Sequence, residues 1–190
     1  MKTKLFAILL CAALAPAAQS RAKTILPDAC GDDSVKFDVK AEKDQPAPAP
    51  PAAGKAQIVF VENESQGLGM GKHATIRFGV DGAWVGANNG NSYFAVNVEP
   101  GVHHLCVSWQ SAFGMLKKSI DVASLTAEPG KVYYYAAEIT IVNIRGASGP
   151  GVTSGGGGGS LTFALAPLNE DEGKYRVKAW KLATWKTNKE

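Results

Sequence analysis

Short apolar segments separated by turn dipeptides recur through the middle of this 190-residue chain, and this pattern limits the possible folds most. The dipeptides are Asp81-Gly82, Asn89-Gly90 and Pro100-Gly101. Asp-Gly and Asn-Gly supply the positive φ angles that tight hairpin turns require, and Pro-Gly favours a type II turn. Strands at intervals of roughly ten residues are typical of two packed sheets. The sequence therefore predicts a mostly β fold, an antiparallel β-sandwich of about eight strands.

The two ends of the chain outside this pattern are less regular. Val35, Phe37 and Val39 alternate with charged residues, as in a half-buried strand. Residues 169–185 fit two structures, because Asn169 could cap a helix with an acidic first turn while later apolar residues alternate as in a strand. We expect one short C-terminal helix, through about Trp180, and then an extended tail.

The N-terminus has the pattern of a secretory signal peptide. Two lysines precede an apolar run of about a dozen residues, and small residues follow it. We expect cleavage after Ser20, with Ala22 as the alternative site. Cys11 lies inside the apolar run and not at its end, which argues against a lipid anchor. The run is too short to cross a bilayer as a stable helix. The sequence thus predicts an exported protein, periplasmic or extracellular, with peripheral association with the outer membrane left open.

Composition then divides the chain into five parts. A proline-rich stretch favours an extended spacer, and a glycine-rich stretch favours a flexible loop. The predicted parts are a signal peptide at 1–20, an N-terminal segment with one strand at 21–44, a Pro-rich linker at 45–54, a β-sandwich domain at 55–185 with a flexible Gly-rich loop at 145–160, and a tail at 186–190.

Charge and cysteine content restrict the partners and the compartment. Without residues 1–20 the chain has 18 basic and 17 acidic residues, a net charge of +1, which gives no electrostatic reason to expect a nucleic-acid partner. Cys30 and Cys106 are the two cysteines that remain, and in an oxidising compartment they most simply form one disulfide. Two separate buried thiols, or a reactive cysteine, are the alternatives.

The histidine pair beside Cys106 could suggest a catalytic or metal site. In a strand, His103 and His104 point to opposite faces and cannot bind one ion together. The sequence also lacks a GxSxG nucleophile motif and a zinc-binding HExxH motif. We therefore expect no metal, no cofactor and no enzymatic activity, with a hydrolase or a thiol-redox protein as the lesser alternative.

Aromatic and asparagine side chains provide a different candidate site. Exposed Trp and Tyr rings stack on sugars, and asparagine amides bind hydroxyl groups, although both residue types are also common in β proteins. The candidate ligand-binding residues are Trp84, Asn88, Asn89, Asn91 and Tyr93.

The motifs of residues 54–182 resemble a bacterial family. They are Asp81-Gly82, residues 90–94, the Pro100-Gly101-x-His103 motif and residues 130–134. With the "ACG" opening at Cys30, the segment is similar to exported forms of domain of unknown function 2846. The resemblance implies a β-sandwich like that of surface-associated PEGA-type domains, supports the pairing of Cys30 with Cys106, and transfers no catalytic residue.

Together these features predict an exported, non-enzymatic module of the cell envelope, with an interaction or structural role. Its partner would be an unknown envelope protein, bound through an exposed sheet edge or aromatic loops. A glycan-binding module is the alternative.

Overall fold

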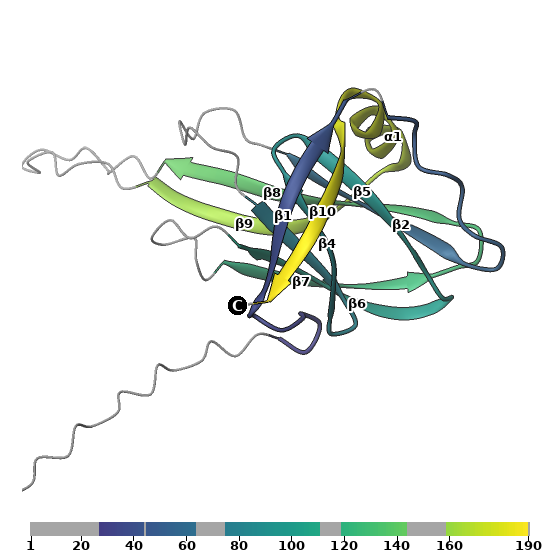
Figure 1. Cartoon of the computed structure of the whole chain (residues 1–190), viewed down its shortest axis with the longest axis horizontal. Coiled ribbons are helices and arrows are strands. Elements are labelled where there is room, and N and C mark those ends of the chain that lie inside the picture. The colour runs from purple at the N-terminus through teal and green to yellow at the C-terminus, as the bar shows by residue number, and fades with distance from the viewer. Residues whose placement is uncertain (1–26, 44, 64–74, 111–118, 144–158, 190) are drawn as a thin grey trace, which may run out of the picture.

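The computed structural model describes residues 27–43, 45–63, 75–110, 119–143 and 159–189. These residues form ten strands and one helix, so the chain is mostly β (Figure 1). The elements are β1 (Val35–Glu42), β2 (Ala56–Asn63), β3 (Thr75–Val80), β4 (Ala83–Asn89), β5 (Ser92–Val98), β6 (Gly101–Trp109), β7 (Ile120–Ala127), β8 (Val132–Asn143), β9 (Gly159–Leu168), α1 (Glu170–Ala179) and β10 (Lys181–Lys189). The predicted signal peptide lies outside the described residues, as does most of the predicted Gly-rich loop, whose last two residues begin β9.

The strands form two sheets of different kinds. One sheet has six strands in the order β1-β10-β5-β2-β8-β9, and the other has four in the order β4-β3-β6-β7. The four-stranded sheet is antiparallel, whereas the six-stranded sheet contains two parallel pairs, β2 with β8 and β10 with β5. The prediction of about eight antiparallel strands is therefore wrong in number and in direction. Strand direction depends on pairing between distant segments, which local patterns do not encode.

The turn dipeptides lie where the sequence predicts, but only one of them joins neighbouring strands. Asp81 and Gly82 both have positive φ angles and connect the antiparallel pair β3 and β4. Gly90 also has a positive φ, yet it leads from β4 in the four-stranded sheet to β5 in the six-stranded sheet. The turn at Pro100-Gly101 takes the chain back again, because β6 belongs to the four-stranded sheet.

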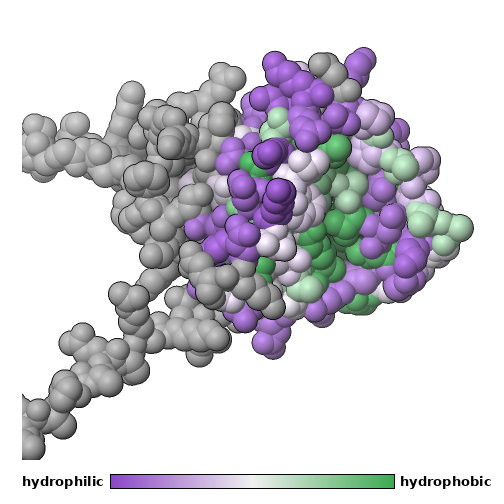
Figure 2. All heavy atoms as spheres, viewed as in Figure 1, coloured by the Kyte–Doolittle hydropathy of each residue, from purple (hydrophilic) through white to green (hydrophobic). Residues whose placement is uncertain are grey.

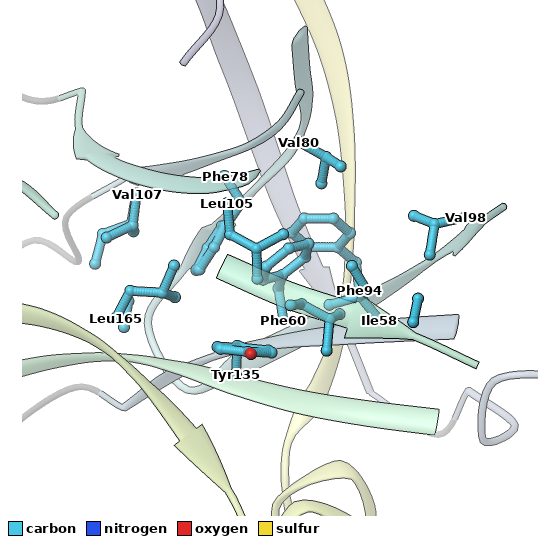
Figure 3. Close-up of a cluster of buried hydrophobic side chains, with 14 of the residues drawn as sticks. Ile58, Phe60, Phe78, Val80, Phe94, Val98, Leu105, Val107, Tyr135 and Leu165 are labelled. Carbon is cyan, nitrogen blue, oxygen red and sulfur yellow. The ribbon is translucent and has the colours of Figure 1, made fainter. Parts of the chain in front are cut away.

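The main core lies between the two sheets. Three phenylalanine rings meet at its centre, with Phe60 of β2 contacting Phe78 of β3 and Phe94 of β5 at centroid distances of 4.8 and 5.4 Å (Figure 3). Leu105, Tyr135 and other apolar side chains surround them. Offset and tilted aromatic pairs add stability beyond the area that they bury. This cluster holds the two sheets face to face.

A second apolar cluster covers the opposite face of the six-stranded sheet. Val59 and Val61 of β2 and Tyr93 of β5 pack there against Val177 of α1 and Trp180, which follows it. β2 is thus buried on both faces, because the other sheet covers one face and α1 shields the second.

The helix begins and ends as its sequence predicts. The Asn169 side chain accepts a hydrogen bond from the Glu172 N–H at 2.9 Å, which caps the first turn. The helix ends at Ala179, and the residues after it form β10, not a loose tail. β10 pairs with β1 over eight residue pairs, so the N-terminal segment is part of the same sheet as the rest of the domain.

The N-terminal segment also crosses the outer face of the four-stranded sheet before it reaches β1. The Ala29 carbonyl accepts a hydrogen bond from the Gly82 N–H at 3.2 Å, and the Trp84 indole donates to the Asp32 carbonyl at 2.8 Å. Cys30 and Cys106 form a disulfide with their Cα atoms 5.2 Å apart, which confirms the predicted pairing.

On the face shown in Figure 2, apolar residues gather in a band with hydrophilic residues on both sides.

Candidate functional site

A groove of about 1040 Å³ lies on the helix-covered face of the six-stranded sheet. Its floor is formed by β2, β5 and β8, one wall by α1, and the other wall by the Pro-rich segment at 45–51. The floor and helix side chains are mainly apolar and aromatic: Val59, Tyr93, Val132, Tyr134, Val177 and Trp180. It is larger than a second hollow, of about 690 Å³, on the four-stranded sheet.

The Pro-rich segment is held against the sheet by side-chain amides. Gln57 of β2 donates to the Ala49 carbonyl at 3.0 Å, and Asn97 of β5 accepts from the Ala52 N–H at 3.1 Å. Proline restricts the backbone to an extended form, so few conformations are lost when the segment is fixed. The segment predicted to be a spacer is therefore also a wall of the groove.

Charge is unevenly distributed along the groove. The lining includes Lys43, Lys174, Lys178 and Lys181, and no aspartate or glutamate belongs to the described residues that line it. Lys174 pairs with Glu170 at 2.6 Å. Among the described residues, no ion pair involves the other three lysines.

Two tyrosines of the floor remain neutral at physiological pH. Burial raises the pKa of Tyr93 above its ordinary value of 10.0. Burial is also the largest cause of the raised pKa of Tyr134. The charge of Lys174 lowers this pKa and the charge of Glu170 raises it, and both effects are smaller than that of burial. The positive charge of the lysines is therefore not offset by a phenolate from either ring.

The five predicted ligand-binding residues separate into two groups. Asn89, Asn91 and Tyr93 line the groove, although Tyr93 is almost fully buried under the helix. Asn88 points into the core between the sheets, where its amide donates to the Phe60 carbonyl at 3.1 Å. Trp84 lies on the outer face of the other sheet, 4.5 Å from the Arg77 guanidinium. The structure thus brings three of the five together and assigns structural contacts to Trp84 and Asn88.

The groove residues that α1 contributes are not among the candidates predicted from the sequence. Lys174 and Lys178 are spaced i, i+4 and lie on one helical face with Val177 beside them, whereas Lys181 is the first residue of β10. This spacing was a usable signal once residues 169–180 were taken as helix. The role of the Pro-rich segment had no comparable signal, because it depends on contacts with β2 and β5.

The histidine pair has structural contacts. His103 Nδ1 lies 2.6 Å from an Asp81 carboxylate oxygen and Nε2 lies 2.7 Å from the Glu99 carbonyl, so both ring nitrogens face acceptors. The other Asp81 oxygen accepts from the His104 N–H at 2.8 Å. The two imidazoles project from opposite faces of β6, as predicted. Within the described residues, no group of three or more His, Cys, Asp or Glu side chains could hold a metal ion.

Near the disulfide, the smaller hollow contains a serine and a histidine. Ser124 Oγ lies 3.5 Å from His104 Nδ1, and both side chains are exposed. A Ser–His–carboxylate relay needs a carboxylate at the second nitrogen of the same ring. Asp81, which also lines this hollow, bonds to the His103 ring and to the His104 backbone instead.

The Asp81–His103 contact predicts a pH-dependent stability. Partial burial lowers the pKa of His103, but the bonds to the Glu99 carbonyl and to Asp81 outweigh it and raise the pKa above 6.5. Burial raises the pKa of Asp81, but the His104 N–H and the His103 ring outweigh it and lower the pKa below 3.8. The contact therefore contributes its full stabilisation between pH 3.8 and pH 6.5, which are the ordinary pKa values of the two side chains. Its contribution is lost as pH rises through the folded pKa of His103, or falls through that of Asp81.

We expect the stability difference between wild type and His103→Gln to shrink as the pH is raised from 5.5 to 8.5. The change should be at most about 1 kcal/mol, because Asp81 is partly exposed and solvent screens the pair. Urea unfolding of both proteins at several pH values measures it, and His104→Gln serves as the control. A constant difference across this range would contradict the assignment.

Gly173 sets the distance between α1 and the groove floor. A Cβ atom at this position would lie 2.2 Å from Cγ of the Tyr134 ring. We expect Gly173→Ala to lower the free energy of unfolding by about 1–2 kcal/mol, since overpacking exceeds the gain of about 1 kcal/mol in helix propensity. Thermal and urea unfolding measure the loss. Adding Tyr134→Val to Gly173→Ala should restore most of the lost stability. A Gly173→Ala protein that is more stable than the wild type would show that the close approach of Gly173 to the Tyr134 ring does not set the packing of α1.

No model of a protein family, no curated protein and no solved structure matches the chain. No helix in the described part of the chain is long and apolar enough to cross a membrane.

Proposed function

We propose that the chain is an exported, non-enzymatic binding module of the cell envelope, and that the groove between α1 and the Pro-rich segment is its binding site. The observation that carries the proposal is the groove itself. It is concave, has a mainly apolar floor and has a small number of polar groups at its rim, which are the common properties of ligand sites in proteins. The walls come from segments far apart in the sequence: hydrogen bonds fix the Pro-rich segment to the sheet, and apolar packing holds α1 against it.

Other parts of the molecule support a binding role more than a catalytic one. The disulfide occupies both described cysteines, and Asp81 and His103 are committed to a structural contact. The disulfide is also compatible with export to an oxidising compartment, as the N-terminal sequence predicts. The resemblance to domain of unknown function 2846 would fit this role and adds no site of its own.

A photo-crosslinking experiment in the producing cells tests the groove as a binding site. A benzophenone side chain replaces Ala179 at the rim of the groove, and the same group replaces Lys186 on β10 as the exposed control. We expect a discrete crosslinked product from position 179 that position 186 does not give. Identical products from both positions, or none from position 179, would contradict the proposal.

A glycan ligand is the second candidate, because Asn89, Asn91 and the half-buried Trp180 line the groove together. Titration with cell-wall glycan fragments, followed by tryptophan fluorescence, tests it directly. A shift that Trp180→Leu abolishes would support a stacked sugar. An unchanged spectrum at millimolar ligand would remove this candidate and leave the binding module in place.

A further inference from the structure

The lysines of the groove indicate the charge of its ligand. Lys43 approaches from the side of the Pro-rich segment, while Lys178 and Lys181 belong to the end of α1 and the start of β10. These three lysines line one hollow and form no ion pair with a described carboxylate, so a negatively charged ligand in the hollow would be attracted by all three. The described lining contains no acidic residue that could serve instead.

The floor indicates the rest of the ligand. The partly buried Val132 and Val177 provide aliphatic surface, and Tyr134 and Trp180 provide aromatic surface, above the buried Val59. Such a floor binds an apolar body by the hydrophobic effect and gives a fully hydrated anion no advantage. A ligand that uses both parts of the groove must combine an apolar body with an acidic head.

The size of the groove indicates a small molecule. A volume of about 1040 Å³ lies near the upper end of the range of roughly 300–1,000 Å³ for ligand pockets. A stable protein partner would instead need a surface of about 800 Å² on each side, generally flat with a polar rim.

We infer that the groove binds a small anionic amphiphile, a fatty-acid-like carboxylate whose apolar chain lies along the floor and whose head group is held by Lys178 and Lys181. This inference rests on the proposed function, which makes the groove the binding site.

Calorimetric titration of the oxidised protein with octanoate, nonanoate and decanoate, below their micellar concentrations, tests the apolar part. We expect binding to tighten about three- to fourfold with each added methylene, which is the increase that burying one methylene group produces. Octylammonium, the cationic counterpart, should not bind, and added salt should weaken the binding of the carboxylates. An affinity independent of chain length would overturn the inference.

The double variant Lys178→Gln/Lys181→Gln tests the head-group contacts. We expect decanoate binding to weaken about tenfold or more, in keeping with the loss of charge-assisted hydrogen bonds. The matched control Lys36→Gln/Lys186→Gln alters two lysines outside the groove and should bind as the wild type does. Circular dichroism confirms that each variant is folded. Equal binding by the two double variants, or equal binding of octanoate and octylammonium, would overturn the inference.

Failure of this inference is distinguishable from failure of the proposed function. If decanoate does not bind but position 179 still gives a specific crosslink, the groove is a binding site for another class of ligand. If glycan fragments bind and carboxylates do not, the glycan candidate replaces the amphiphile. If neither a carboxylate nor a glycan binds and position 179 gives no crosslink, both proposals are wrong.

Discussion

Replacing both Cys30 and Cys106 with alanine is expected to lower the free energy of unfolding by about 4 kcal/mol. The disulfide closes a loop with a sequence separation of 76 residues, and a crosslink of this span removes much of the conformational entropy of the unfolded chain. Both cysteines are buried, and alanine avoids placing a new hydroxyl group there. Such a loss is a large fraction of the stability of a typical domain.

Urea unfolding with and without reductant measures this effect. The wild type should lose a similar amount of stability when it is reduced, whereas the double alanine variant should be insensitive to reductant. Thiol titration of the unfolded, unreduced protein without its signal peptide should find no free thiol. Two free thiols in that protein, or a wild type whose stability does not change on reduction, would contradict the predicted role of the bond.

Replacing Arg77 with methionine is expected to cost about 3 kcal/mol of stability. The guanidinium is 2% exposed, and it donates to the carbonyls of Asp33 and Val35, to the Asp33 carboxylate and to Ser108 Oγ, at 2.9–3.3 Å. It also lies over the Trp84 ring. Methionine retains much of the volume but leaves these acceptors without their donor, and an unsatisfied buried polar group costs about 1–3 kcal/mol.

Asp33→Asn is the matched control for the charge itself. The Asp33 side chain is partly exposed, so solvent screens the ion pair, and we expect a loss of about 1 kcal/mol or less. Equal losses in the two variants would show that the ion pair, and not the backbone acceptors, determines the contribution of Arg77. Hydrogen exchange should show faster exchange in the segment before β1 for Arg77→Met alone.

Arg77 and the disulfide hold the same part of the chain. Residues 27–34 lie across the outer face of the four-stranded sheet, attached through Cys30, through the Asp33 contacts and through the indole of Trp84. The cysteine pair was predictable from the sequence, whereas Trp84 was predicted to be part of a ligand site. Trp84 instead packs against this segment so closely that a Cβ atom on Gly31 would lie 2.4 Å from its ring.

The sheet edges show why an exposed strand is a weaker candidate for partner binding than the groove. The Gln110 side chain donates to the Phe37 carbonyl and accepts from the Phe37 N–H, which satisfies part of the β1 edge. At the other end of the six-stranded sheet, Asp121 of β7 accepts from the Leu165 N–H of β9 at 2.8 Å. Side chains of the four-stranded sheet thus occupy edge positions that a partner strand would need.

Local signals in the sequence determined the elements themselves. Alternating Val35, Phe37 and Val39 specified β1, and Asp81-Gly82 specified the turn between β3 and β4, because both signals act within a few residues. Asn169 capped the helix for the same reason. The pairing of Cys30 with Cys106 was predictable from the cysteine count, because only these two cysteines lie outside the predicted signal peptide.

Only the tertiary structure decided which sheet each strand joins and where the groove lies. Backbone hydrogen bonds are alike in every strand, so the sequence around Asn89-Gly90 gives no indication that the chain passes from one sheet to the other there. The parallel pairing of β2 with β8 joins segments about 75 residues apart. The groove needs that pairing, the helix and the Pro-rich segment together, and it exists only after their side chains have packed against one sheet face.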